Sequence, residues 1–213
     1  MPVKFDKREY RKIDAVMETR TAEDGQMIVE GYATTYNQPY MLARDEKVIV
    51  MEQVDARAAD KADKSDTIMQ YDHEGPVFAR ISNGTLELIS DEHGLKVRAY
   101  LGGTERGRQL FEEIAGGYVN KMSIAFNVRK EKRTRTKNAE GIIIITRTIE
   151  EFGKIFDVSA VSIPANDATE ISSRTISDGL ITEAEEEIRA EEERQRRIGE
   201  IRKILKGEKT DDE

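Results

Sequence analysis

The stretch Gly116-Gly117-Tyr118-Val119-Asn120-Lys121-Met122-Ser123-Ile124-Ala125-Phe126 places a serine inside a short apolar strand, directly after a glycine-rich turn. Side chains alternate between the two faces of a strand, so Met122, Ile124 and Phe126 are expected to face the core. Ser123 then shares the opposite face with small or polar neighbours, and that face is open enough to admit a substrate. A serine in a strand is structural more often than catalytic, so its role depends on the residues that accompany it.

The segments around this strand predict a mainly β protein with a few helices. β-Branched and aromatic runs bounded by turn residues predict strands at 27–36, 46–51, 66–73, 77–81, 84–90, 95–101, 118–129, 141–146 and 155–163. The middle strands follow one another at intervals of about ten residues, which is typical of an antiparallel meander in a sandwich or barrel. Thr104 caps a helix that ends at Gly116-Gly117, and residues 53–64 predict a short surface helix. Residues 10–18 fit a helix and a strand nearly equally.

The C-terminal part differs in composition from this β region. Residues 172–181 predict a linker that separates a β domain (1–171) from a charged helical tail (182–213). Thr182 and Glu185 form a capping box for a helix that runs to about Leu205. Charged residues 191–197 interrupt its apolar positions, so a continuous coiled coil is not expected. The tail is either a solvated helix or an interaction or removable segment.

Composition excludes several classes of site. The 213 residues contain no cysteine and two histidines, which excludes thiolate and multi-histidine metal sites. We therefore expect no metal and no cofactor. A net charge of -8 argues against nucleic acid as the main partner. The chain has no apolar run of membrane-spanning length, so we expect a soluble intracellular protein with no membrane partner.

Basic residues are concentrated at 129–138, between two predicted strands. A solvated turn is the simpler interpretation of this segment. The alternative is a contact surface for an acidic partner.

A serine becomes a good nucleophile when a neighbouring base takes its proton and a third group orients that base. Histidine suits the middle role because its ordinary pKa lies near neutrality. His93 lies in a hairpin-tip turn and is expected to be exposed, whereas His73 ends a strand. Asp157 lies in an otherwise apolar strand, where a carboxylate is costly to bury without a partner. It either pairs with an imidazole, or faces solvent, or pairs with Lys154 or Arg147.

Glu150 and Glu151 are competing candidates for the third position. They stand at the edge of a polar stretch, where exposure explains them more simply.

The order His73, Ser123, Asp157 on a predicted β domain resembles the prohead (capsid-maturation) serine proteases of tailed bacteriophages, which are related to the herpesvirus assemblins. The resemblance spans about Val29 to Ala168. Its carriers, taken together and in order, are Glu30-Gly31-Tyr32-Ala33, Tyr71-Asp72-His73-Glu74, Ala79-Arg80, Asp91, Gly94-Leu95-Lys96-Val97, Ile114-Ala115-Gly116-Gly117, Met122-Ser123-Ile124-Ala125-Phe126, Phe156-Asp157-Val158-Ser159-Ala160-Val161 and Pro164-Ala165-Asn166.

The resemblance implies an antiparallel β-barrel of the assemblin or prohead-protease type, and a serine endopeptidase. In that family the histidine and the strand serine match His73 and Ser123. The third member is usually a glutamate before Val-Ser, where this chain has Asp157, and the herpesvirus relatives use a second histidine there. Backbone N–H groups would form the oxyanion hole, with Ala165 and Asn166 as candidates. The arginines that assist the herpesvirus enzymes at the comparable place are absent from this chain.

The resemblance also implies partners and a location. The substrate would be the major capsid protein, the scaffold domain or both, cut inside the immature capsid in the host cytoplasm, with self-cleavage and possible self-association. The alternative is a noncatalytic capsid-assembly or scaffolding factor that retains the protease fold.

Overall fold

The computed structural model describes residues 8–13, 17–162 and 167–205. Its strands are β1 (Glu9–Ile13), β2 (Glu18–Thr21), β3 (Met27–Thr35), β4 (Tyr40–Arg44), β5 (Val48–Val54), β6 (Ile68–Tyr71), β7 (Glu74–Arg80), β8 (Leu86–Ser90), β9 (Gly94–Tyr100), β10 (Lys121–Lys137) and β11 (Ile143–Val161). A 3-10 turn follows β7 at Ile81–Asn83, and the two α-helices are α1 (Glu105–Ala115) and α2 (Asp167–Leu205). The prediction of a mainly β chain with a few helices is confirmed.

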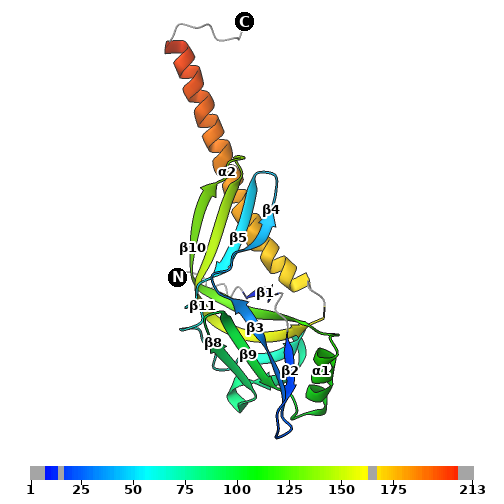
Figure 1. Ribbon diagram of the computed structural model, residues 1–213. Helices are drawn as coiled ribbons and strands as arrows, with labels where there is room; N and C mark the ends of the chain where they lie inside the picture. Colours follow the sequence, from blue (N-terminus) through cyan, green and yellow to red (C-terminus); the bar gives the residue numbers. More distant parts are fainter. Residues whose placement is uncertain (1–7, 14–16, 163–166, 206–213) are drawn as a thin grey trace.

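Two sheets form the fold, and β10 and β11 are its longest strands (Figure 1). The first sheet has the order β1-β10-β11-β5-β4, and β6 and β7 join it through β11. The second sheet, β2-β3-β9-β8, is antiparallel. β11 pairs antiparallel with β10 along its length, but parallel with β5 near its start and with β6 near its end.

The predicted antiparallel barrel is wrong. The first sheet is mixed, and no ladder joins the two sheets within the described part of the chain. Closure into a barrel requires every edge strand to find a partner. Hydrophobicity alone does not fix the direction of the neighbouring strand, so the apolar runs of β11 do not reveal its parallel pairing with β5 and β6.

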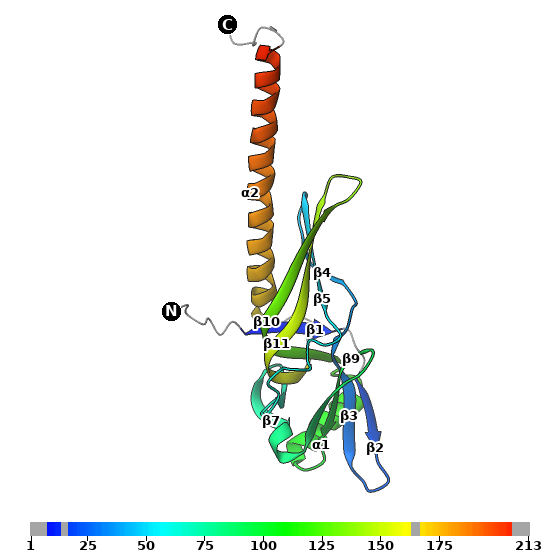
Figure 2. The same cartoon turned by 90° about the vertical axis from the view of Figure 1, so that its left-hand side faces the viewer.

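The lower body encloses the main core, between the second sheet, α1, the first half of β10 and the second half of β11 (Figure 2). Phe126 and Phe152 pack edge to face with their ring centroids 4.7 Å apart. The predicted helix α1 is confirmed: the Thr104 hydroxyl accepts a hydrogen bond from the Gly107 N–H at 3.0 Å. A Cβ on Gly107 would lie 2.0 Å from the Leu101 carbonyl oxygen, so glycine allows this helix to approach the sheet closely.

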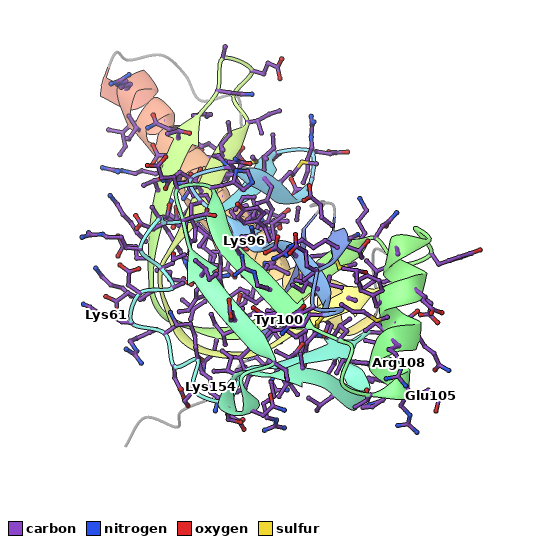
Figure 3. The ribbon with its side chains drawn as sticks, turned by 60° about the horizontal axis from the view of Figure 1, so that its bottom comes forward. Lys61, Lys96, Tyr100, Glu105, Arg108 and Lys154 are labelled. Atoms are coloured by element: carbon purple, nitrogen blue, oxygen red, sulfur yellow. The ribbon has the colours of Figure 1, made fainter. Side chains whose placement is uncertain are left out.

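Charged and polar side chains lie on the outer surface of the body. Lys96 and Tyr100 lie on the outward face of β9, and Glu105 and Arg108 lie on the outward side of α1 (Figure 3). The apolar face of α1, with Leu110, Phe111 and Ile114, is buried.

The arm above the body consists of β4, β5 and the distal halves of β10 and β11, and α2 lies along it and continues past its tip (Figures 1 and 2). Leu180 and Ala184 are buried against Val48, Val50 and Ile143. Residues 172–181 were predicted to be a linker, but they lie within α2. The reason is an apolar stripe at four-residue spacing, formed by Ile176, Leu180, Ala184 and Ile188, which begins before the capping box and packs on the arm.

Two further predictions about the chain change. Residues 53–64 were predicted to form a surface helix, but β5 continues to Val54 and turns follow it. The basic segment 129–138 is the second half of β10 up to Lys137, not a loop. Part of its charge meets α2, because Arg133 pairs with Glu183 at 3.5 Å and Arg135 pairs with Glu187. The acidic surface that these arginines contact therefore belongs to the same chain.

Candidate active site

His73 lies in a two-residue turn between β6 and β7. Asp72 and His73 have φ values of +50° and +61°, and the flanking residues Tyr71 and Glu74 pair across the hairpin. A two-residue loop with both residues left-handed matches the twist of the strands. Because neither residue is glycine, surrounding contacts must hold the turn. The Asp72 carboxylate accepts hydrogen bonds from the Ser162 N–H at 3.0 Å and from the Ser162 hydroxyl at 2.7 Å.

Ser123 and Asp157 come from the neighbouring strands β10 and β11. In this ladder Ser123 lies opposite Ser159, and Ala125 lies opposite Asp157. The Asp157 strand also pairs with β6, whose end carries the turn with His73. The neighbouring strands β10, β11 and β6 of one sheet therefore bring together residues that are 50 and 34 positions apart in the sequence.

A chain of short hydrogen bonds joins the three side chains. His73 Nε2 lies 2.6 Å from Ser123 Oγ, and His73 Nδ1 lies 2.5 Å from Asp157 Oδ1. A carboxylate accepts hydrogen bonds, so Nδ1 carries the proton and Nε2 is free to accept one from the serine. The Ser159 hydroxyl donates to the same Asp157 Oδ1 at 2.8 Å. The carboxylate is thus held from two sides.

The chain's own strand β1 covers this group. In the β1–β10 ladder Lys12 lies opposite Ser123, and Ser123 Oγ is 3.1 Å from the Arg11 carbonyl oxygen. The Tyr10 ring meets the His73 ring edge to face at 4.9 Å between centroids. Ser123 is 1% exposed. The expectation of an open serine face is therefore wrong for this conformation, because an additional strand was not foreseen there.

The serine hydroxyl has two acceptors but one proton. A hydroxyl that donates to the Arg11 carbonyl oxygen does not donate to His73 Nε2, so the serine is not activated in that state. The covered conformation therefore lowers the reactivity of Ser123 as well as its access to other chains.

A cluster of buried charges lies on the opposite face of β1. Arg11 and Glu9 meet Glu52 of β5 and Arg147 of β11, and these four residues are between 0% and 6% exposed. Burial opposes ionisation of Glu52, but Arg11 and Arg147 outweigh it and hold the Glu52 pKa below its ordinary value. Burial likewise opposes the charge on Arg11, and the carboxylate of Glu52 outweighs it, so the Arg11 pKa is raised.

Within the described residues, the other predicted candidates lie away from His73, Ser123 and Asp157. His93 is exposed at a hairpin tip, as expected. Glu150 pairs with Lys130 at 2.8 Å and Glu151 with Lys61 at 3.7 Å, so the two competing acids form ion pairs away from His73. Lys154 contacts Asp63 and Arg147 belongs to the charge cluster, so neither pairs with Asp157. The oxyanion candidates Ala165 and Asn166 lie outside the described residues.

Sequence reasoning did not identify Ser159, Tyr10 or the charge cluster. Ser159 was visible as the residue two places after Asp157, on the same face of a strand. Glu9 and Arg11 alternate with Tyr10 and Lys12, as residues of a strand do. Because the residues on the buried face of this strand are charged, the usual apolar alternation is absent from the sequence.

The described residues contain neither a candidate metal site nor a candidate membrane helix. No group of three or more His, Cys, Asp or Glu side chains there could hold a metal ion. No helix within 8–13, 17–162 and 167–205 is both long and apolar enough to cross a membrane.

Serine, imidazole and carboxylate follow one another here with the connectivity of a serine-hydrolase triad, on a fold made mainly of β-sheet. The family model described as caudovirus prohead serine protease matches residues 15–181. The match covers most of the chain, and the chain belongs to this family. The resemblance seen in the sequence is therefore confirmed: the family is that of the prohead serine proteases of tailed phages.

Among solved structures, the bacteriophage T4 capsid assembly protease, gp21, is similar with 13% sequence identity and a TM-score of 0.39. The similarity covers 73% of this chain and 99% of that chain. No curated protein matches this chain significantly.

Proposed function

We propose that this chain is a serine endopeptidase in which Ser123 is the nucleophile, His73 the general base and then the general acid, and Asp157 the group that orients His73. The observation that carries the proposal is the continuous chain of hydrogen bonds from Ser123 Oγ through both ring nitrogens of His73 to Asp157. Family membership supports the reaction class.

The reaction follows from these positions. His73 Nε2 takes the Ser123 proton as Oγ forms a bond to the peptide carbonyl carbon, and Asp157 stabilises the imidazolium. The imidazolium gives that proton to the leaving amine as the C–N bond breaks. Water then attacks the acyl-enzyme with the same base and releases the new carboxyl end. Backbone N–H groups would stabilise the oxyanion, and Ala165 and Asn166 remain our candidates for them.

The proposed substrates are the major capsid protein, its scaffold domain or both, cut inside the immature capsid in the host cell. The proposal also includes self-cleavage. The position of β1 supports it, because a segment of the same chain lies against Ser123 as an added antiparallel strand. Extended peptides that bind proteins at a sheet edge take the same arrangement.

The test is processing of a co-expressed capsid precursor by Ser123→Ala. We expect a loss of at least about 10³-fold, because the nucleophile is removed while binding is retained. Ser82→Ala is the matched control, since Ser82 is exposed and hydrogen-bonds Asp66 away from the site. Full processing by Ser123→Ala would contradict the proposal.

The alternative function, a noncatalytic assembly factor, predicts a different set of results. Ser123 would then resist a serine-directed fluorophosphonate, and capsids would mature normally with His73→Ala. The closed position of β1 is the observation that favours this alternative. Labelling after prolonged incubation of the full chain distinguishes a temporarily covered nucleophile from an inert one.

A further inference from the structure

Arg11 of β1 occupies a carboxylate pocket beside the candidate nucleophile. Its Nε lies 2.5 Å from Glu52 Oε1 and its Nη2 lies 2.8 Å from Glu52 Oε2. Such a two-bond contact matches the planar fork of a guanidinium, which a lysine ammonium cannot reproduce. The carbonyl of the same residue faces Ser123 Oγ. One residue of β1 thus meets both the nucleophile and this pocket.

Glu9, two residues earlier, occupies a complementary position. Arg147 Nη1 lies 2.8 Å from Glu9 Oε2 and Arg147 Nη2 lies 2.9 Å from Glu9 Oε1. Tyr10 lies between the two on the other face of the strand, against the His73 ring. The strand therefore presents a carboxylate, a residue on the catalytic side, and a guanidinium in that order.

The partners of Glu9 and Arg11 are fixed parts of the sheet. Glu52 and Arg147 come from the central strands β5 and β11, and they contact each other at 2.6 Å. Tyr40 donates to Glu52, and Glu131 accepts from Arg147. If β1 leaves, Glu52 loses the guanidinium of Arg11 and Arg147 loses the carboxylate of Glu9. A peptide that replaces β1 with apolar side chains would leave buried charges short of partners, which is costly.

We infer that the site selects peptides with the order carboxylate, any residue, arginine, and that the bond after the arginine is the one cut. The inference rests on the endopeptidase function proposed above and adds its specificity. Glu52 recognises the arginine and Arg147 recognises the acidic residue. The acyl group of the arginine passes to Ser123 Oγ, and the proton taken by His73 goes to the released amine.

The first test is the cleavage of a random peptide mixture by the full wild-type chain, read by mass spectrometry. We expect arginine before the cut bond, and an acidic residue two places before the arginine, to be enriched at least tenfold over glutamine. Cleavage without that enrichment overturns the inference and leaves the endopeptidase function standing. Absence of both cleavage and fluorophosphonate labelling of Ser123 overturns both.

Glu52→Gln tests the pocket directly. The preference for arginine over glutamine is expected to fall at least tenfold. Glu30→Gln is the matched control, because Glu30 also forms a close pair with an arginine, Arg98 at 2.5 Å, but in the second sheet. A preference that Glu52→Gln leaves unchanged overturns the inference.

A second variant keeps the test valid if Glu52→Gln folds poorly. Arg11→Gln should slow self-cleavage between Arg11 and Lys12 at least tenfold, as measured by the mass of the product that begins at Lys12. The same variant should raise cleavage of added peptides, because β1 is held less firmly. Misfolding would lower both rates, whereas unchanged self-cleavage would contradict the inferred specificity.

Discussion

At the scale of single residues, the site depends on a turn that would be unfavourable elsewhere. Asp72 and His73 both adopt the left-handed conformation, which costs non-glycine residues about 1–3 kcal/mol each. Ser162 holds the Asp72 side chain and Asp157 holds the imidazole. The turn therefore fixes the direction of the ring before a substrate arrives.

Asp157 also explains a departure from the family pattern noted in the sequence. Its Oδ1 is already 2.5 Å from His73 Nδ1, so a glutamate with one more methylene would need a different backbone position. The aspartate thus fits this sheet geometry, in which β11 and the His73 turn lie close together.

Ser159 is predicted to be a positioning residue that acts through Asp157. Ser159→Ala removes the hydroxyl that donates to Asp157 Oδ1 at 2.8 Å. We expect kcat to fall about tenfold with KM nearly unchanged, since a hydrogen bond to a carboxylate contributes about 1.5 kcal/mol or more, and about 1.4 kcal/mol corresponds to a factor of ten.

Steady-state kinetics on a cleavable peptide would measure this effect. Ser159→Thr restores a hydroxyl and should recover part of kcat. A rise in KM alone, with kcat retained, would contradict the positioning role.

At the scale of elements, buried charges and the ladder to β10 hold β1 in place. Glu9 and Arg11 are buried on one face, and Glu52 and Arg147 receive them. Buried ion pairs add little net stability, but breaking one side of them is strongly unfavourable. Such a contact favours a peptide that brings the same charges as β1 over one that lacks them, in agreement with the inferred specificity.

Acid is predicted to weaken this contact. The Glu52 pKa is lower in the fold than its ordinary value of 4.5, so its stabilising effect is complete above that value and is lost as the pH falls through the lowered pKa. The thermal midpoint of the wild type should therefore exceed that of Glu52→Gln by a constant amount above pH 4.5.

Below that pH the difference should shrink. Melting curves of both chains between about pH 7 and pH 3 measure it. A difference that stays constant over the whole range would show that the charge of Glu52 does not hold the structure together.

The helix α2 is an element of the arm for part of its length. Leu180 and Ala184 are buried on the arm, and Glu183 and Glu187 meet Arg133 and Arg135 of β10. Lys47, directly before β5, pairs with Glu192 at 3.9 Å, and further along the helix Ile201 is 56% exposed (Figure 2). Whether this end recruits the enzyme into a capsid or is removed, it is held away from the site by the arm.

At the scale of the whole molecule, β1 competes with every other substrate. A segment tethered by a short connection has an effective concentration in the millimolar range. We therefore predict that specific activity is low in dilute solution and rises with protein concentration, as chains remove β1 from one another. The crowded interior of an immature capsid would supply such concentrations.

Initial rates on a capsid-precursor peptide over a series of enzyme concentrations test this prediction. Wild-type chain mixed with Ser123→Ala chain shows whether one molecule cuts another. Equal specific activity at all enzyme concentrations would contradict the predicted competition by β1.

Features that depend on neighbouring residues could be predicted from the sequence, and features that depend on residues far apart in the chain could not. The cap at Thr104 and the buried face of Met122 and Phe126 follow from local pattern and were predicted correctly. The apolar runs 141–146 and 155–163 were predicted to be two strands, whereas β11 runs unbroken from Ile143 to Val161. The start of α2 was misplaced because Gly179 and nearby serines suggested a linker, whereas the stripe of Leu180 and Ala184 finds its partner in distant strands. Tertiary packing outweighs local propensity there.

The sequence by itself determined the chemistry available: no thiol, two imidazoles, one serine strand and one carboxylate in an apolar strand. It also determined the family, through the order of His73, Ser123 and Asp157 and the motifs around them. The tertiary structure alone decided that these three side chains meet and that β1 covers them, with Glu52 and Arg147 as its anchors. The physical reason is that strand pairing depends on hydrogen bonds between backbones far apart in the chain, which side-chain pattern specifies weakly.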